Sequence, residues 1–329
     1  MNPAPYNSLE NAQYACTRQA FGNELLRLAQ QDSRILALSA DLTISVQLTD
    51  FMEQLPEQFI NFGIAEQNMV SAASGLAIGG MIPFAASFAA FIALRACEQA
   101  RVDCAYSNTN VKLVGTSSGI SAGPAGPTHQ CIEDIAIFRS MPNMVVLTPA
   151  DAAETKAAVK LMSEEFGPMY LRLGRDKWPV LHTSEEVSFK IGGSECFRDG
   201  EDLTIFAIGN MVSEAIKASE ILAKENISAR VISFFTIKPI DRETILQAVR
   251  ETKAIITVED HNLLAGMGSA VAEVAAEAGV PFTFKAIGVP DVYPPIGDAK
   301  DLYKRYSMTA DGIVQTAKTL IEKKKFSMA

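Results

Sequence analysis

The sequence predicts an α/β protein of two domains, each built on a mostly parallel sheet flanked by helices. At 329 residues the chain is longer than a typical single domain. Short apolar segments alternate with helix-like segments in both halves, and this alternation is typical of parallel sheets covered on both faces. Residues 177–193 lose helical periodicity and gain turn residues. We therefore expect one domain at residues 1–185 and a second, smaller one at residues 190–329.

The first half begins with an expected helix and then alternates strand and helix. Strand-like apolar runs occupy residues 34–41, 111–117 and 144–150. Helices are expected at residues 17–30, directly after Glu66, and at residues 151–165 with Asp151 as the N-cap. In such sheets, functional sites collect beyond the carboxyl ends of the strands.

The second half repeats the same alternation. Strands are expected at residues 202–210, 228–237 and 253–261, and helices at residues 211–226, 241–251 and 263–278. The last helix opens with the Gly-rich segment "GMGSA", which could cradle a phosphate at a helix N-terminus. It has no Lys-Ser/Thr after it and no full GxGxxG pattern, so close helix packing is the favoured interpretation.

Composition and charge narrow the functional classes. Hydrophobic residues make up 48% and charged residues 20%, which is ordinary globular usage. The net charge of −9 disfavours a nucleic-acid surface, and we expect the basic segment "EKKKF" near the C-terminus to be a solvated helix end. Five scattered cysteines without metal-ligand spacing suit a reducing compartment. The N-terminal residues lack the pattern of a secretory signal, so we expect a cytoplasmic location.

An unusual stretch spans residues 62–95. It carries one acid, Glu66, and then no charged side chain until Arg95. A buried carboxylate is penalised unless a partner is supplied, although an acid at a helix N-terminus is also favoured by the helix dipole. The apolar run is long enough for a membrane-spanning helix. However, Gly79, Gly80 and Pro83 divide it into pieces that are too short to cross a bilayer, so we expect no membrane crossing.

A Gly- and Pro-rich loop at residues 115–130, "GTSSGISAGPAGPTHQ", directly follows an expected strand. Its composition is typical of a functional loop rather than of a sheet. It ends near His129. A lone histidine is more often structural than catalytic, so residue spacing alone leaves both roles open.

Several motifs together resemble a known family. The segments "GIAEQNMVSAASGLAIGG", "FAASFAAF", "GPTHQCIEDIAIFRSMPNMVVLTPAD" and "LRLGR" follow one another in this order. They resemble the pyrimidine-binding domain of transketolases, and "TVEDH" and "GMGSAVAEV" are similar to the C-terminal domain of these enzymes. The resemblance covers nearly the whole chain. It implies the C-terminal subunit of a split transketolase, which transfers a two-carbon ketol unit between a ketose phosphate and an acceptor sugar.

The resemblance implies specific roles around thiamine diphosphate. Glu66 matches the buried acid that hydrogen-bonds a ring nitrogen of the aminopyrimidine and so helps to prepare the nucleophilic carbon of the cofactor. Phe88 and Phe91 match aromatic residues that pack on this ring, and Asp41 matches an acid near the cofactor and the subunit contact. His129 matches the histidine that hydrogen-bonds the donor sugar and its developing oxyanion.

Other positions imply a phosphate-binding end of the substrate channel. Arg18, Ser45 and Arg175 match groups that hold the sugar phosphate, and arginine suits phosphate through its bidentate fork. Without the resemblance, each would be an ordinary surface residue. Ser117 stands where transketolases have a histidine at this end of the channel.

Two further departures concern the ring and the sugar. Leu94 stands where a third aromatic residue is expected, which implies weaker stacking on the cofactor. Ala125 replaces an aspartate that senses the stereochemistry of a substrate hydroxyl, and its methyl group cannot accept a hydrogen bond. We therefore expect a branched or otherwise modified sugar phosphate among the substrates.

The resemblance also implies a partner. The sequence contains no Gly-Asp-Gly followed 25 to 30 residues later by Asn, the family's signature for binding the metal and the diphosphate. We therefore expect a separate N-terminal transketolase subunit that holds Mg²⁺ and the diphosphate, in a heterotetramer with sites at subunit interfaces. Two alternatives remain, namely the beta subunit of a thiamine-dependent 2-oxo acid dehydrogenase and a non-catalytic scaffold subunit.

Overall fold

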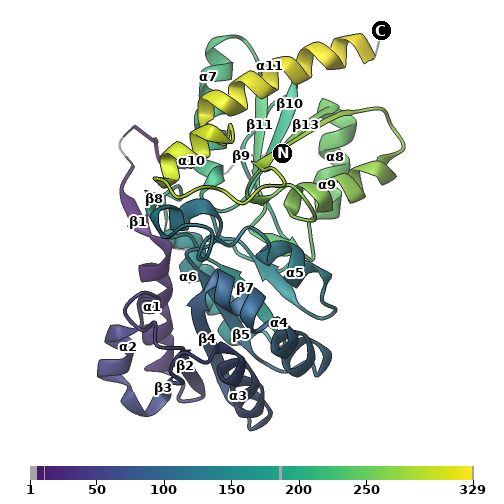
Figure 1. The fold of residues 1–329 in the computed structure, drawn as a ribbon. Coiled ribbons are helices and arrows are strands. Elements are labelled where there is room, and N and C mark those ends of the chain that lie inside the picture. The colour runs from purple at the N-terminus through teal and green to yellow at the C-terminus, as the bar shows by residue number, and fades with distance from the viewer. Residues whose placement is uncertain (1–5, 11, 185–186, 328–329) are drawn as a thin grey trace.

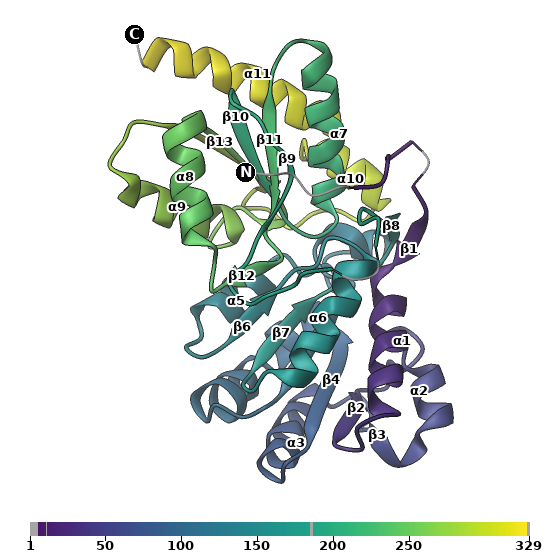
Figure 2. The same ribbon diagram turned by 180° about the vertical axis from the view of Figure 1, so that it is seen from behind.

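Two sheets, each with helices on both faces, lie one above the other in the molecule (Figures 1 and 2). The computed structural model describes residues 6–10, 12–184 and 187–327. The arrangement confirms the predicted α/β class. None of the helices in these ranges has the length and apolar character that a bilayer crossing requires.

The first sheet has seven strands. All neighbouring pairs are parallel except the edge pair β12 and β6. In spatial order the strands are β12 (Thr236–Lys238), β6 (Val145–Leu147), β7 (Met169–Arg172), β5 (Lys112–Thr116), β4 (Ile82–Phe88), β2 (Ile35–Ser39) and β3 (Phe59–Asn61).

Helices cover both faces of the first sheet. Ala37 of β2 packs in an apolar cluster with helices α1 and α6, whereas the next residue, Leu38, packs in a second cluster with α3 and α5. Asp151 caps α6 as predicted, since its carboxylate accepts a hydrogen bond from the Glu154 N–H at 2.9 Å. The helices are α1 (Thr17–Ala29), α2 (Thr49–Gln54), α3 (Glu66–Ile78), α4 (Cys97–Gln99), α5 (Asp134–Ser140) and α6 (Ala152–Glu164).

The second sheet has five strands, with helices α7 and α11 on one face and α8 and α9 on the other. The apolar cluster under α8 and α9 continues into the cluster beside α3 and α5, so the two domains share part of their core. In spatial order the strands are β14 (Thr283–Val289), β13 (Ala254–Asn262), β10 (Leu203–Ala207), β11 (Ala229–Ser233) and β9 (Glu195–Arg198). The helices are α7 (Met211–Lys224), α8 (Arg242–Thr252), α9 (Met267–Ala275), α10 (Ala299–Arg305) and α11 (Ala310–Ser327).

The expectation of one strand at residues 228–237 was wrong, because this segment forms two strands in different sheets. β11 belongs to the second sheet, whereas β12 pairs antiparallel with β6 of the first sheet. Thr148 binds the chain between them: its hydroxyl donates to the Phe234 carbonyl at 2.8 Å and its N–H to the Phe235 carbonyl at 2.9 Å. The second half of the chain therefore completes the sheet of the first half.

Antiparallel pairings at the periphery were not expected either. β9 pairs antiparallel with β11 at the edge of the second sheet. β1 (Tyr14–Cys16) and β8 (Lys177–Pro179) form a separate two-stranded ribbon. β1, β8 and β9 have three or four residues each, too few for a recognisable alternation of polar and apolar side chains.

The Gly-rich segment at the start of α9 packs closely on its own domain, in agreement with the favoured interpretation. The N–H groups of Met267 and Gly268 each donate to the Glu259 carboxylate at 2.7 Å. A side chain at Gly266 would lie 2.2 Å from the same carboxylate. The N-terminus of this helix is thus occupied by an acid of the chain itself.

A buried polar network joins β7 of the first sheet to β13 of the second. Arg172 Nε donates to Asp134 Oδ2 at 2.8 Å, and Arg172 Nη2 donates to the Asp260 carbonyl at 2.6 Å. Tyr170 OH donates to the same Asp134 oxygen at 2.7 Å. Arg172 is 6% exposed and Asp134 is fully buried, so each charge depends on the other for compensation.

His261 is buried beside this network in its neutral form. Its Nδ1–H donates to the Asn262 carbonyl at 2.8 Å, and its Nε2 accepts from the Ala136 N–H at 3.4 Å. Burial lowers the pKa of His261 to about 4, even though the Asp134 carboxylate nearby favours the charged form. The hydrogen bonds and the direction of the pKa shift therefore agree.

We expect the protein to lose stability as the pH falls from 6.5 towards 4, because the unfolded chain then binds a proton at His261 that the folded chain does not. Between pH 7.5 and pH 5 this group should remove about 2 kcal/mol from the free energy of unfolding. Urea unfolding of the wild type and of His261→Asn at both pH values measures the effect. The Asn side chain keeps a donor near the position of Nδ1, so the variant should be less sensitive to acid. Equal sensitivity in the two proteins would contradict the prediction.

Candidate active site

Four of the predicted site residues gather at one edge of the seven-stranded sheet. Asp41 follows β2, Glu66 follows β3 as the first residue of α3, Phe88 ends β4, and Ser117 follows β5. Because these strands are parallel, their carboxyl ends all meet at this edge. The edge is where sites form in sheets of this type.

Glu66 is the most deeply buried acid of this group, with 1% of its surface exposed. Its Oε1 accepts a hydrogen bond from the Ser87 hydroxyl at 3.2 Å, and its Oε2 accepts one from Arg95 Nη1 at 2.6 Å. The lone carboxylate of the apolar stretch thus has a cationic partner within the chain itself.

Arg95 was not expected at the site, although it is the first charged residue after Glu66 in the sequence. It ends a π-helical turn, Phe91–Arg95, that follows β4. Its guanidinium carbon lies 4.2 Å from the centre of the Phe91 ring, and its side chain is 42% exposed. A flat cation therefore stacks on an aromatic ring while it donates to a buried carboxylate.

Phe88, Phe91 and His129 form an aromatic group beside this ion pair. The ring centres lie 5.7 Å apart for Phe88 and Phe91, 5.9 Å for Phe88 and His129, and 5.4 Å for Phe91 and His129. The His129 Nδ1 is 2.9 Å from the Thr128 hydroxyl. Leu94 is 49% exposed. The structure brings together the acid, the two phenylalanines and the histidine that the family resemblance implied.

The loop that carries His129 is fixed at its base. Gly119 and Cys131 pair as an antiparallel bridge, with N–H to carbonyl distances of 2.7 Å and 3.2 Å. The Ile120 N–H donates to Asp260 Oδ1 at 2.8 Å, which ties the loop to the second domain. Gly119 has a φ of +60°, and a side chain there would lie 2.3 Å from the Asp260 carboxylate. Only glycine fits this approach. Asp260 is a further residue that sequence reasoning did not assign to the site.

Three other predicted residues differ in accessibility. Asp41 is exposed, with a φ of +59° and its N–H donating to Asn61 Oδ1 at 3.0 Å. Ala125 is half-buried at the end of the 3-10 turn Ile120–Ala125. Ser117 is buried, with 3% of its surface exposed.

The predicted phosphate residues also come together. Arg18 donates through Nη1 to the Ser45 carbonyl and through Nη2 to the Arg175 carbonyl, both at 2.7 Å. Arg175 is exposed, and its Nη1 lies 3.4 Å from the Ala122 carbonyl of the histidine-bearing loop. A cavity of about 1100 Å³ opens beside them. The basic residues that line it are Arg18, Lys156, Arg175 and Lys177.

Two family models match successive parts of the chain. The model for the transketolase pyrimidine-binding domain matches residues 13–180, and the model for the transketolase C-terminal domain matches residues 192–313. Together they cover most of the chain, including every residue described above as part of the candidate site.

Several similar proteins match along nearly their whole length. A subunit of an apulose-4-phosphate transketolase from Phocaeicola vulgatus is 39% identical, over 96% of this chain and 100% of its own. A subunit of a 6-deoxy-6-sulfo-D-fructose transketolase from a Clostridium species is 40% identical, over 94% of this chain and 95% of its own. A solved structure described as a split gene transketolase, inactive beta4 tetramer, superposes with a TM-score of 0.86 at 41% identity, over 93% of this chain and 98% of its own.

Replacement of Arg95 by Met should destabilise the isolated chain by about 1–2 kcal/mol, because Glu66 Oε2 would stay buried without its charged donor. Water reaching the half-exposed guanidinium site limits this loss. Arg101→Met is the matched control, since it makes the same chemical change at an exposed position.

Denaturant unfolding of both variants measures the difference. In a Glu66→Gln background the Arg95 replacement should cost much less, because the charge it neutralises is gone. Equal losses from Arg95→Met and Arg101→Met would contradict the assignment.

Proposed function

The chain belongs to the transketolase family, and we propose that it is the C-terminal subunit of a two-chain transketolase. Such an enzyme moves a two-carbon ketol unit from a ketose phosphate to an acceptor sugar. The observation that carries the proposal is the buried Glu66 carboxylate, which faces a flat cation stacked on Phe91 at the carboxyl edge of the sheet.

The residues beside Glu66 fit the aminopyrimidine ring of thiamine diphosphate. The Arg95 guanidinium occupies the place that we assign to this ring. It is flat and rich in nitrogen, it donates to the Glu66 carboxylate, and it stacks on the Phe91 ring. An aminopyrimidine offers the same flat shape and a ring nitrogen for the same carboxylate. We infer that Glu66, Phe88 and Phe91 bind this ring, and that the Arg95 side chain, which is half-exposed, moves aside when they do.

Each of these residues has a distinct task. Thiamine diphosphate, when bound, supplies the nucleophilic carbon that carries the ketol unit. Glu66 hydrogen-bonds the ring nitrogen from a buried position, where water does not compete for the contact. The two phenylalanines hold the plane of the ring and exclude water from it. His129 reaches the same aromatic group and hydrogen-bonds the oxygen of the donor sugar on which negative charge develops.

A second chain completes the site in this proposal. The chain carries no family signature for diphosphate and metal binding, and its similar subunits have nearly the same length. We propose that an N-terminal transketolase subunit holds the diphosphate and Mg²⁺ through oxygen ligands, in a heterotetramer with sites at subunit interfaces. Asp41 is exposed at the edge of the sheet, where it is accessible to that subunit and to the cofactor.

The cationic cavity supports a phosphorylated sugar as substrate. We propose that Arg175 contacts the phosphate directly and that Arg18, which also binds the Ser45 carbonyl, holds Arg175 in place. Ser117 is buried and does not line this cavity, so we propose for it only a supporting place at the same end of the channel. All five cysteines are free thiols, which supports a reducing, cytoplasmic setting.

Glu66→Gln should lower ketol transfer by the reconstituted two-chain enzyme at least about 100-fold, because the amide cannot share a proton with the ring nitrogen. Transfer from a ketose phosphate to an aldose phosphate is the measurement, with circular dichroism to confirm folding. Arg101→Met should retain full activity. Unchanged activity in Glu66→Gln would support a scaffold role, and decarboxylation of pyruvate by the pair would support a 2-oxo acid dehydrogenase subunit.

Ala125 bears on the choice of sugar. Its methyl group leaves the substrate hydroxyl near it without an acceptor, which favours a substrate that lacks this hydroxyl or carries a branch there. Similar subunits are named for apulose 4-phosphate and for 6-deoxy-6-sulfo-D-fructose, neither of which is an ordinary pentose phosphate.

The wild-type pair should therefore prefer a branched or modified ketose phosphate over xylulose 5-phosphate. Ala125→Asp should shift the ratio of kcat/KM values towards xylulose 5-phosphate by about 10-fold, the worth of one hydrogen bond to a charged group. Ala125→Asn, which adds a side chain of nearly the same size without its charge, is the matched control. A clear preference of the wild type for xylulose 5-phosphate would refute this choice of substrate, while the transketolase proposal would stand.

A further inference from the structure

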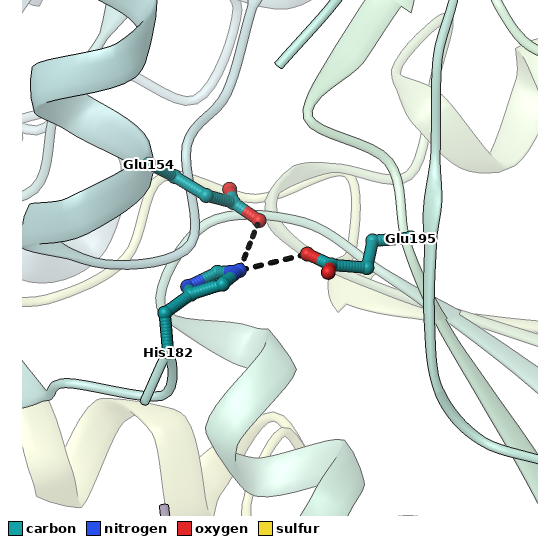
Figure 3. Close-up of side chains that lie close together, drawn as sticks. All are labelled: Glu154, His182 and Glu195. Carbon is teal, nitrogen blue, oxygen red and sulfur yellow. Dashed lines mark hydrogen bonds and ion pairs between the residues drawn. The ribbon is translucent and has the colours of Figure 1, made fainter. Parts of the chain in front are cut away.

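A second group of acids surrounds the imidazole of His182 and does not contain any residue assigned above to the cofactor or the sugar (Figure 3). Glu154 lies in the first turn of α6, His182 follows β8, and Glu195 is the first residue of β9. α6 packs on the first sheet and β9 belongs to the second. The group therefore bridges the two domains.

The imidazole is held in a defined orientation. Its Nδ1 is 2.9 Å from Asp151 Oδ2, and the same oxygen accepts the N–H groups of Leu181 at 2.7 Å and His182 at 3.1 Å. Three donors converge on one carboxylate oxygen, so Nδ1 carries the proton and Nε2 is available on the other side. A carboxylate behind Nδ1 is the usual support of a metal-binding histidine.

Both remaining acids face Nε2. The Glu195 Oε2 lies 2.7 Å from it and the Glu154 Oε1 lies 3.7 Å from it (Figure 3). Glu154 is fully buried, and its other oxygen, Oε2, accepts the Ala150 N–H at 2.6 Å. Within residues 6–10, 12–184 and 187–327, Oε1 has no hydrogen-bond donor. A buried carboxylate oxygen without a donor is strongly unfavourable and points to a positively charged ligand.

The charges lead to the same conclusion. Asp151, Glu154 and Glu195 supply three carboxylates, and among the described residues the ion pairs of Glu154 and Glu195 involve only His182. A protonated imidazole would leave two of the three negative charges uncompensated. A divalent cation bound to the neutral imidazole would leave only one. Without such a cation, the acids must keep a proton between them.

We propose that Glu154, His182 and Glu195 bind one Zn²⁺ ion through His182 Nε2 and one oxygen of each carboxylate. The ligand atoms all lie within 4.8 Å of one another. Around a tetrahedral zinc ion, neighbouring ligand atoms lie about 3.3 Å apart. The observed distances of 2.7 Å and 3.7 Å from Nε2 bracket this value, so small side-chain movements suffice. The imidazole nitrogen favours zinc over Mg²⁺ or Ca²⁺.

The role of this ion is structural, and it does not depend on the proposed catalytic function. The ligands tie the start of α6 to the start of β9 and so hold the two domains together. Glu195 is 21% exposed at its side chain, and the large cavity reaches His182. Both features give the ion a path of entry, and a water molecule would complete the four-coordinate shell.

Zinc binding to the full, tag-free chain after chelator treatment tests the proposal. Titration calorimetry and elemental analysis should give about one Zn²⁺ per chain for the wild type and a rise in Tm on addition of zinc. His182→Gln and Glu195→Gln each replace a direct ligand, so each should weaken zinc binding at least about 100-fold, since even the loss of a supporting outer partner costs about 10- to 100-fold. Mg²⁺ should not replace Zn²⁺ in either measurement.

Controls separate this group from other zinc ligands. His129→Gln should bind zinc as the wild type does. When Co²⁺ replaces Zn²⁺, the absorption spectrum should be that of a cobalt ion with nitrogen and oxygen ligands. It should lack a thiolate-to-cobalt band, because none of the five free cysteines belongs to the group. If His182→Gln does not fold, zinc binding by Glu195→Gln, whose side chain is partly exposed, tests the proposal instead. No zinc binding by the wild type, or binding as tight as that of the wild type in both His182→Gln and Glu195→Gln, would overturn the proposal and leave a retained proton as the explanation.

Discussion

The burial of the Arg172 guanidinium is the constraint on which the arrangement of the two domains depends. Its Nε requires the Asp134 carboxylate of the first domain, and its Nη2 requires the Asp260 carbonyl of the second. A buried guanidinium that lost either partner would be strongly destabilised, so other packings of the domains are penalised. The Asp260 carboxylate in turn receives the Ile120 N–H. The packing of the two domains thereby helps to position the loop that carries His129.

The same rule explains the state of the acid at the sheet edge. A buried and charged Glu66 needs a cationic partner, and Arg95 supplies one within the chain. The Arg95 side chain is half-exposed, so it can turn into solvent at a modest cost in free energy, whereas the buried Glu66 side chain cannot. A binder that replaces Arg95 must therefore offer both a donor and a flat face. In the proposed function, the aminopyrimidine ring meets both requirements.

The sequence predicts those features of the fold that depend on residues close together in the chain. Apolar runs identify β2 and β10, and Asp151 identifies the start of α6 because it caps its own helix. The pairing of β12 with β6 and the contact of Arg95 with Glu66 join residues far apart in the sequence, the latter 29 positions apart, and no periodicity encodes them. The candidate site itself came from motif resemblance. Its supports, Arg172 and Asp260, lie 88 positions apart and became visible only in three dimensions.

These supports explain why the chain needs both of its domains to present half of a site. The histidine-bearing loop leaves the first sheet after β5 and is bridged at its base within the first domain, but two further anchors come from the second domain. They are the Asp260 carboxylate at Ile120 and the Pro295 carbonyl, which accepts from Gln130 Nε2 at 3.3 Å. The first domain alone would lack both anchors, and His129 would lose its fixed place beside Phe91. A division between two chains that keeps these domains together therefore preserves the histidine, the aromatic rings and Glu66 as one preformed surface, ready for a partner to close.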